Sequence, residues 1–330
     1  MPRVAVLGAA GFAGALAAAL VERHPRLELT TITARSDEGR RLDHIYPRHR
    51  VRRELDAYDP DRVAEQADAA IVAYPHKAAA PVVEELLNRG LKVVDLSADF
   101  RLDRERYERW YQPHPAPALL ARAVYGLPEL HRDAIAASDL VAGPGCYATA
   151  AILALAPLGD RIEDAIVDGK SGVSGAGRGA TDSTHFVTVA ENVVPYKTEG
   201  HRHRAEMEHE LAIDPRALTF TPHLLPLDQG LLCSAYVRTS EDLSRADVRT
   251  LYEDFYAGER FVELSDVPPG VRDVRETNVC RIHVTTEPDS GRVLAFAAID
   301  NLWKGAAGQG IQDLNLMLGL DEGDGLGEAA

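Results

Sequence analysis

The segment Gly143-Pro144-Gly145-Cys146 places a cysteine in a turn that can activate a thiol. An apolar run at 140–142 leads into this turn, and a helix-forming run follows at 149–155, so Cys146 is predicted at or near a helix N-terminus. The helix dipole and the free N–H groups there favour a thiolate, and the same N–H groups can hold an oxyanion on a bound carbonyl. Cys146 is therefore the predicted nucleophile, against the common alternative of a small core residue.

The other cysteines are predicted to be core residues. Cys233 and Cys280 lie inside alternating strand patterns, "LLCSAYV" and "VCRIHV", without a neighbouring turn. Three cysteines that lie far apart do not form a disulfide framework, which favours a reducing, cytoplasmic compartment. The chain has no CxxC and no paired Cys/His spacing, so no metal site is predicted.

A nucleophilic cysteine needs a proton donor or acceptor, and "YKTEGHRHRAEMEHEL" offers two histidines. His201 and His203 follow a glycine at a predicted loop-to-helix junction, among Lys197, Arg202 and Arg204. This is the densest basic cluster of an acidic chain, and it can attract an anionic substrate, with Arg202 as a predicted substrate residue. The residues do not decide which histidine acts, and a solvated basic helix start is the alternative interpretation.

A glycine-rich turn, "GAAGFAG" at 8–14, predicts a dinucleotide site. Gly8, Gly11 and Gly14 follow an apolar strand, and Phe12 and Ala13 open a predicted helix. Glycines let the backbone approach a pyrophosphate, and the helix N-terminus offers N–H groups and a positive dipole end. The alternative is tight strand–helix packing, but the order of strand, turn and helix is the one that the motif requires.

The end of the second predicted strand indicates which dinucleotide is bound. Arg35 and Ser36 follow it, and an arginine with a hydroxyl group suits the 2′-phosphate of NADP. Asp37 and Glu38 come next, and either one would favour NAD if it turned inward. His76, just past another strand, is a further candidate for the nucleotide crevice.

Two domains are predicted to position these residues. Up to residue 145, short apolar strands alternate with helices, the pattern of a Rossmann-like parallel sheet. After about residue 165, long alternating strands indicate a mixed or antiparallel sheet, within an α+β catalytic domain over 146–300. A last helix is predicted within 301–330, and the acidic, Gly-rich end from 321 is predicted to be frayed.

Composition excludes several classes of protein. Among 330 residues, 36 are basic and 51 acidic, which gives a net charge of −15 and disfavours nucleic acid and anionic lipid as partners. No run of about 18 apolar residues is present, so no membrane span is predicted. The opening "MPRVAVLGAAGFAG" lacks the basic region and cleavage site of a signal peptide.

Taken together, the motifs resemble the N-acetyl-γ-glutamyl-phosphate reductase family, the arginine-biosynthesis branch of the aspartate-semialdehyde dehydrogenase superfamily. The resemblance runs nearly end to end. The most specific segments are "VVDLSADFRL" at 93–102 and "GPGCYATA" at 143–150. It continues in "VYGLPEL" at 124–130, "SGVSGAGRGA" at 171–180, "GHRHRAEMEHEL" at 200–211 and "AIDNLWKGAAGQGIQDLNLMLG" at 298–319.

The resemblance implies an NADP-dependent oxidoreductase that acts on an aldehyde or oxo group. Cys146 would attack the γ-acyl phosphate of N-acetyl-L-glutamate, phosphate would leave, and hydride from NADPH would reduce the thioester to the semialdehyde. The acid–base group would be His201 or His203, with a slight preference for His203. A homodimer or homotetramer is also implied.

Further residues take roles only through this resemblance. Ser97 and Arg101 would lie in the substrate pocket near the phosphate. Ser171, Gly172 and Gly175 would form the loop beside the nicotinamide and the thiol. Asn301 and Lys304 would bring the C-terminal segment to the cofactor, so the last helix, within 301–330, would return to the NADP-binding domain. The resemblance also implies that 146–300 is a catalytic and dimerisation domain.

Alternative functions stay open from the sequence. A sister reductase would act on a glutamyl or aminoadipyl phosphate attached to an acidic carrier protein in lysine or arginine synthesis. Such relatives often have asparagine after the cysteine, so Tyr147 favours the free acetylated substrate, as does the negative net charge. Aspartate-semialdehyde or glyceraldehyde-phosphate dehydrogenase activity is disfavoured by "GPGCYATA", and a silent NADP-binding regulator is disfavoured by the placement of Cys146.

Overall fold

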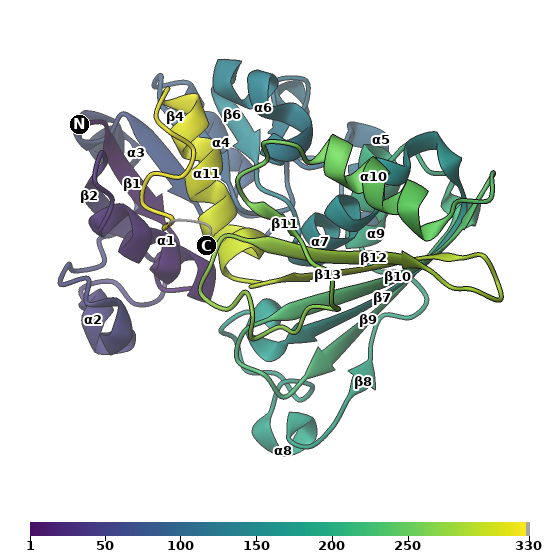
Figure 1. Cartoon of the computed structure of the whole chain (residues 1–330). Coiled ribbons are helices and arrows are strands. Elements are labelled where there is room, and N and C mark those ends of the chain that lie inside the picture. The colour runs from purple at the N-terminus through teal and green to yellow at the C-terminus, as the bar shows by residue number, and fades with distance from the viewer. Residues whose placement is uncertain (328–330) are drawn as a thin grey trace. The chain divides into compact units, whose positions relative to one another are not determined.

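The computed structural model describes residues 1–327 and divides the chain into two compact units. The first unit comprises Met1–Pro144 and the C-terminal segment from Ala306, and the second comprises Gly145–Gly305. Figure 1 shows the elements of both. Within the described residues, no helix has the length and apolar character needed to cross a bilayer.

The first unit contains a six-stranded parallel sheet in the order β2-β1-β3-β4-β6-β5. The order changes direction at β1, so a crevice is expected outside the carboxyl ends of β1 and β3, where doubly wound sheets bind nucleotides. The strands are β1 (Arg3–Leu7), β2 (Glu28–Thr33), β3 (Ala69–Val72), β4 (Lys92–Asp95), β5 (Val124–Tyr125) and β6 (Leu140–Ala142).

Helices connect and cover this parallel sheet. Short buried apolar runs alternate along the chain with Ala- and Leu-rich segments. This alternation gives parallel strands that are joined by crossover helices. The last helix, α11, packs against α1, α6 and β4 within the first unit (Figure 1). The helices are α1 (Phe12–Glu22), α2 (Leu42–Ile45), α3 (Pro60–Gln66), α4 (Ala80–Leu87), α5 (Arg104–Trp110), α6 (Pro128–Ala137) and α11 (Gly308–Met317).

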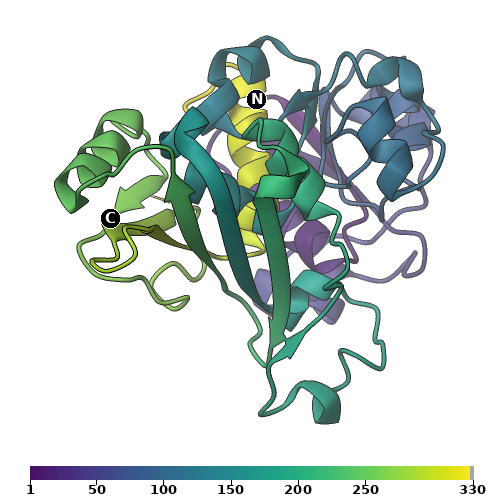
Figure 2. The same cartoon turned by 90° about the vertical axis from the view of Figure 1, so that its right-hand side faces the viewer.

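The second unit contains a seven-stranded mixed sheet in the order β11-β12-β13-β10-β7-β9-β8. Its long central strands lie side by side in Figure 2. The β7–β9 and β11–β12 pairs are parallel and the others antiparallel. The strands are β7 (Ile162–Gly172), β8 (Val194–Pro195), β9 (Leu218–Leu225), β10 (Leu231–Thr239), β11 (Val262–Leu264), β12 (Cys280–Thr286) and β13 (Val293–Ile299).

Three helices cover one face of this mixed sheet: α7 (Cys146–Leu155), α9 (His203–Glu210) and α10 (Arg245–Phe255). The alternation in β10 explains the arrangement, because Leu231, Cys233, Ala235 and Val237 are fully buried while Tyr236 is exposed. Short α8 (Phe186–Val189) lies in the excursion between β7 and β8. The predicted fold class, a Rossmann-like domain with an α+β domain and a mixed sheet, is confirmed.

Cys233 and Cys280 are confirmed as core residues. Both are fully buried and neither is in a disulfide; Cys233 lies on β10 and Cys280 on β12. Burial raises the pKa of the Cys233 thiol, which keeps it protonated at neutral pH. Neither has the partial exposure that a reactive thiol needs.

The acidic C-terminal end is ordered as far as residue 327, so the prediction of a frayed tail from 321 is wrong for 321–327. Leu326 is buried, and the backbone carbonyl of Asp324 accepts hydrogen bonds from Asn315 and from His24. Glu322 pairs with Arg132 at 2.6 Å. Composition does not reveal such contacts, because they come from distant elements. Residues 328–330 of the predicted tail lie outside the described residues.

Candidate active site

Cys146 is the first residue of α7, as the turn predicted, and its side chain is partly exposed. Gly145 is the N-cap, with extended backbone angles and no side-chain cap. The remainder of α7 is buried, and the helix packs against β10, β13 and α9, which hold it in a fixed position. The first turn therefore presents N–H groups without intrahelical partners beside the thiol, where they favour negative charge.

The ring of His203 lies directly against Gly145. A β-carbon on Gly145 would come within 2.5 Å of His203 Nε2 and 2.7 Å of the two adjacent ring carbons. His203 begins α9 and is buried. Absence of a side chain at Gly145 thus allows an imidazole to approach the residue next to the nucleophile.

His201 contacts His203 and supports it. Its Nδ1 accepts a hydrogen bond from the backbone N–H of His203 at 3.2 Å, and the two rings meet edge to face at 4.6 Å. Burial, followed by the nearby charges of Lys197 and Arg202, lowers the pKa of His201 to about 3. His201 is therefore neutral at pH 7, with Nδ1 as the acceptor.

Glu206 is a site residue that the sequence reasoning missed. It is almost fully buried on α9, one turn after His203, and its Oε2 accepts the backbone N–H of Gly145 at 2.9 Å. This bond joins the helix that carries His203 to the turn that carries Cys146. The spacing of three between His203 and Glu206 puts both on one helix face, and that was the available signal.

Gly305 contacts the nucleophile from another segment. It lies in the π-helical turn Trp303–Ala307, and a β-carbon on it would lie 2.7 Å from the Cβ of Cys146. Its N–H donates to the carbonyl of Asp300 at 3.0 Å. π-Helical turns are frequent at functional sites.

The loop predicted beside the nicotinamide is brought together with Asn301. Asn301 Nδ2 donates to Ser174 Oγ at 2.9 Å, and its Oδ1 accepts the N–H of Gly230 at 2.8 Å. Gly175 packs on the hydroxyl of Ser171, which is buried, and the backbone leaves no room for a side chain at Gly172. The structure therefore brings Ser171, Gly172, Gly175 and Asn301 into one loop cluster.

Lys304 occupies a different environment. It is fully buried, and its Nζ lies 5.7 Å above the ring of Phe261. A cation over an aromatic ring is stabilised by the quadrupole of the ring. Its predicted contact with the cofactor stays a prediction.

The basic cluster around the histidines separates into two parts. Arg204 forms an ion pair with Glu208 at 2.6 Å along α9 and donates to the carbonyl of Pro215. Its guanidinium is therefore engaged by these two residues. Arg202 is the half-buried N-cap residue of α9. Burial first, and then the charge of Arg202, lowers the pKa of both His201 and Lys197. Arg202 and Lys197 thus place two positive charges next to the buried histidines.

In the first unit, the glycine turn has the geometry of a phosphate cradle. Gly8 has a φ of +85°, and a β-carbon there would lie 2.6 Å from the carbonyl oxygen of Ala73. Gly11 is the N-cap of α1, and Phe12 and Ala13 form its first turn. Any side chain at Gly14 would collide with the carbonyl of Gly8.

The segment after β2 lies at the same edge, because the N–H groups of Gly8 and Ala9 both donate to Thr33. The exposed guanidinium of Arg35 lies 5.0 Å above the Tyr74 ring. Asp37 turns inward, but it accepts the Ser36 hydroxyl and pairs with Arg40 at 2.5 Å. The carboxylate that would select NAD is thus engaged by a cation, and Glu38 is exposed.

Ser97 and Arg101 lie in the loop after β4, also in the first unit. The Ser97 hydroxyl donates to Asp95 at 2.6 Å and accepts the N–H of Asp99, and Arg101 donates to the carbonyl of Leu96. Burial raises the pKa of Asp95 to about 7, against the hydrogen bonds from Ser97, which lower it. These contacts fix the loop; its role toward substrate stays a prediction.

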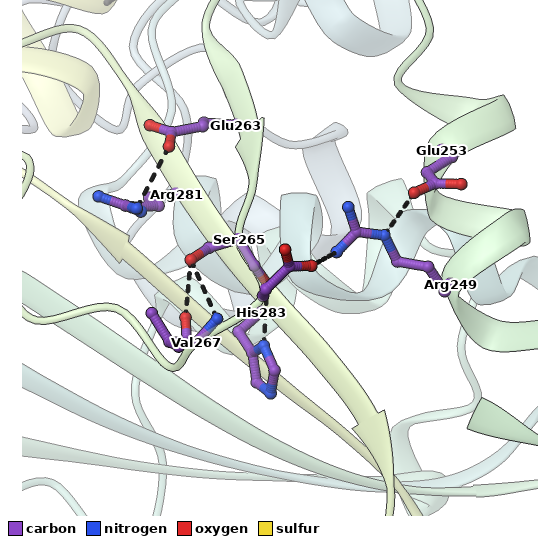
Figure 3. A network of polar contacts seen from close by, with 8 residues as sticks. Arg249, Glu253, Glu263, Ser265, Val267, Arg281 and His283 are labelled. Atoms are coloured by element: carbon purple, nitrogen blue, oxygen red, sulfur yellow. Dashed lines mark hydrogen bonds and ion pairs between the residues drawn. The ribbon is translucent and has the colours of Figure 1, made fainter. Parts of the chain in front are cut away.

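A separate hollow of about 270 Å³ lies between α10 and the end of β11. Figure 3 shows the polar contacts in this part of the second unit. Arg249 crosses it and pairs with Glu253 at 2.5 Å and Asp266 at 3.1 Å, while His283 Nδ1 bonds to the carbonyl of Ser265 at 2.9 Å. Arg249, Glu253 and Asp266 are already paired with one another there, and the lining includes none of the predicted site residues.

Comparisons with known proteins agree with this description. Residues 3–138 match the family model of the semialdehyde dehydrogenase NAD-binding domain, and residues 146–301 match that of the semialdehyde dehydrogenase dimerisation domain. Aspartate semialdehyde dehydrogenase from Candida albicans, solved with NADP, has a TM-score of 0.75 at 15% identity, over 96% of this chain and 98% of that one. Aspartate semialdehyde dehydrogenase II from Vibrio cholerae has a TM-score of 0.73 at 20% identity, with the same coverage of both chains.

A nucleotide-binding parallel sheet and a mixed-sheet unit with a cysteine at the N-terminus of its first helix define an oxidoreductase of the semialdehyde dehydrogenase class. Curated proteins named N-acetyl-gamma-glutamyl-phosphate reductase match over the full chain. The one from Syntrophobacter fumaroxidans is 45% identical over 100% of this chain and 99% of its own length. That from Geobacter sulfurreducens is 45% identical over 99% and 98%. The chain belongs to the N-acetyl-γ-glutamyl-phosphate reductase family, as its motifs predicted.

Proposed function

We propose that this chain reduces N-acetyl-L-glutamyl 5-phosphate to N-acetyl-L-glutamate 5-semialdehyde with NADPH and releases phosphate, as a step of arginine biosynthesis. The observation that carries the proposal is the imidazole of His203 packed against Gly145, directly before a cysteine at a helix N-terminus. The names of the full-length relatives support the choice of substrate.

An assay of NADPH oxidation and phosphate release tests this function with two substrates. We expect one phosphate and one semialdehyde per NADPH with free N-acetylglutamyl phosphate. Turnover only with a glutamyl or aminoadipyl phosphate attached to a carrier protein would contradict the proposal and favour the sister reductase.

The reaction divides into two chemical steps on Cys146. Its thiolate, favoured by the first turn of α7, attacks the acyl carbon; a C–S bond forms, the C–O bond to phosphate breaks, and a thioester remains. The N–H groups of the same turn stabilise the oxyanion. When bound, NADPH supplies a hydride to the thioester carbon. His203 gives and takes the proton of the oxyanion as the C–S bond breaks and the semialdehyde leaves.

The residues of the first unit fit a nicotinamide dinucleotide. Gly8 and Gly14 leave an open backbone that β-carbons would fill, and the N-terminus of α1 follows them directly. This is the arrangement that binds a pyrophosphate. We propose that Gly8, Gly11, Phe12, Ala13 and Gly14 hold the pyrophosphate, and that the cluster of Ser171, Gly172, Gly175 and Asn301 contacts the nicotinamide.

The two histidines are expected to differ in a direct comparison. His203→Asn should lower kcat by about 10²–10⁴-fold, because the acid–base group is lost. His201→Asn should cost less than about tenfold, because asparagine can still accept the N–H of His203. Steady-state kinetics of both variants checks this. An effect of His201→Asn equal to or above that of His203→Asn would exchange the two roles.

We further propose NADP as the cofactor, with Arg35 and Ser36 at its 2′-phosphate. Asp37 is neutralised by Arg40 and so does not repel that phosphate. Arg35→Ala should raise the KM for NADPH about tenfold to 100-fold, as expected for a lost charge-assisted hydrogen bond, and leave the KM for NADH unchanged. Arg109→Ala, an exposed arginine on α5, is the control. Equal effects of Arg35→Ala on both cofactors would refute this assignment.

The oligomer is proposed to form through the face of the mixed sheet opposite α7, α9 and α10. Ile166 and Tyr236 are cross-strand neighbours on this face and are 42% and 38% exposed. The family model covering this unit is named a dimerisation domain. Light scattering of Tyr236→Glu should show a smaller species than wild type, whereas Val267→Glu, at another exposed apolar position, should not. An unchanged mass for Tyr236→Glu would exclude this face.

A cytoplasmic location is proposed because the mechanism needs a free thiol. None of the three cysteines, all within the described residues, forms a disulfide, and a reducing compartment keeps Cys146 as a thiol. Ser97, Arg101 and Arg202 are proposed substrate contacts, since the two arginines can pair with the anionic groups of an acyl phosphate. Lys304 keeps its proposed role toward the cofactor.

A further inference from the structure

The residue directly after the nucleophile is a buried tyrosine that reaches both histidines. Tyr147 is the second residue of α7 and is 2% exposed. Its ring centroid lies 5.8 Å from that of His201 and 6.0 Å from that of His203. Tyr147 therefore links the helix that carries Cys146 to the segment that carries the acid–base histidine.

Both the ring and the hydroxyl group of Tyr147 are held by the mixed sheet. The hydroxyl donates to the carbonyl of His223 on β9 at 2.7 Å. The ring lies against Gly169 of β7, where a β-carbon would come within 2.6 Å of the tyrosine Cδ1. A third contact comes from Phe220, 5.4 Å away edge to face. The tyrosine thus has one position, set by two strands.

Both histidines pack against the ring of Tyr147. His201 is enclosed by Tyr147, Tyr196, Phe220 and His203 in edge-to-face contacts of 4.6–5.8 Å. Because His201 in turn accepts the N–H of His203, a shift of the tyrosine ring moves both imidazoles. Rings in such contacts resist small rotations since their geometry is directional.

We propose that Tyr147 is a positioning residue that fixes His203 relative to Cys146 through its hydroxyl anchor on β9. The inference rests on the proposed function, since it assumes that these two groups react together. Tyr147 itself touches no reacting atom in this account. Its anchor keeps the imidazole at the distance that proton transfer needs, where small displacements cost much of the rate.

Tyr147→Phe removes the anchor and keeps the ring. The matched control is Tyr252→Phe. Like the Tyr147 hydroxyl, the buried Tyr252 hydroxyl donates to a backbone carbonyl, and its acceptor, Ala154, lies at the other end of α7. The two variants lose comparable bonds of one helix and should lose similar thermal stability. We expect kcat to fall about tenfold in Tyr147→Phe, from misplacement of the proton donor, with the KM for NADPH unchanged. Tyr252→Phe should keep the wild-type kcat.

A second readout does not depend on turnover. The rate at which iodoacetamide alkylates Cys146 as a function of pH reports the thiolate and its surroundings. We expect a displaced profile for Tyr147→Phe and the wild-type profile for Tyr252→Phe. Gly169→Ala, which pushes the ring from below and keeps the hydroxyl group, should reproduce the Tyr147→Phe displacement. Equal kcat values and equal alkylation profiles for Tyr147→Phe and Tyr252→Phe would overturn the positioning role.

These results are separable from those on the function itself. If Cys146→Ser retained turnover, the proposed function would fail whatever Tyr147→Phe showed. If Cys146→Ser is inactive and Tyr147→Phe equals its control, only the positioning role fails.

Discussion

Cys146→Ser is expected to lower kcat/KM for the acyl phosphate by at least about 10⁴-fold, because a serine hydroxyl at the same helix N-terminus stays protonated. The first turn of α7 favours the thiolate form of Cys146, whereas a serine alcohol is too weak an acid for that turn to ionise it. Serine also keeps nearly the same volume, so the fold should be preserved. Initial rates of NADPH oxidation give the loss, and circular dichroism checks the fold.

A cysteine elsewhere in the same unit provides the control. Cys233→Ala removes a buried thiol below α7 and should keep kcat within a few-fold of wild type, because its protonated side chain takes no part. If Cys146→Ser kept a rate comparable to that of Cys233→Ala, the nucleophile would be misassigned.

Gly145→Ala is expected to lower kcat by about 10²-fold or more, through a single added methyl group. The backbone angles of Gly145, φ −72° and ψ 140°, suit alanine, so the effect does not come from backbone strain. It comes from the ring of His203, which occupies the space of the new β-carbon. The ring must move away, and the bond from Gly145 to Glu206 must lengthen with it.

Gly179→Ala is the matched control in the same unit, since no described atom lies within 4 Å of the position of its added β-carbon. Pre-steady-state measurements should show that Gly145→Ala slows the chemical steps while the KM for NADPH is unchanged. Activity of Gly145→Ala within twofold of Gly179→Ala would mean that His203 does not act from its place at Gly145.

The architecture could be predicted because the spacing of apolar residues within each segment indicates a strand or a helix. The alternation in β10 separates the buried Leu231 and Cys233 from the exposed Tyr236 before any partner strand is known. The strand–turn–helix order at Gly8 and at Cys146 likewise fixed where the two helix N-termini occur. Local chemistry and tertiary structure agree at these positions.

The assignment of the histidines could not come from the sequence. His201 and His203 have the same neighbours along the chain, and only the contact with Gly145, 58 positions away from His203, distinguishes them. Glu206 was missed for the same reason, because its partner is a backbone N–H of another segment. The ordered tail was misjudged because its backbone bonds to His24 and Asn315, which composition does not encode.

Isolation of an acyl-enzyme tests the central claim most directly. Enzyme mixed with N-acetylglutamyl phosphate without NADPH, quenched in acid and digested, should yield the Cys146 peptide heavier by one N-acetylglutamyl group. Hydroxylamine should remove that mass, and addition of NADPH before the quench should replace the adduct with free semialdehyde. An unmodified Cys146 peptide from enzyme mixed with substrate without NADPH, in a preparation that turns over once NADPH is added, would contradict the covalent mechanism.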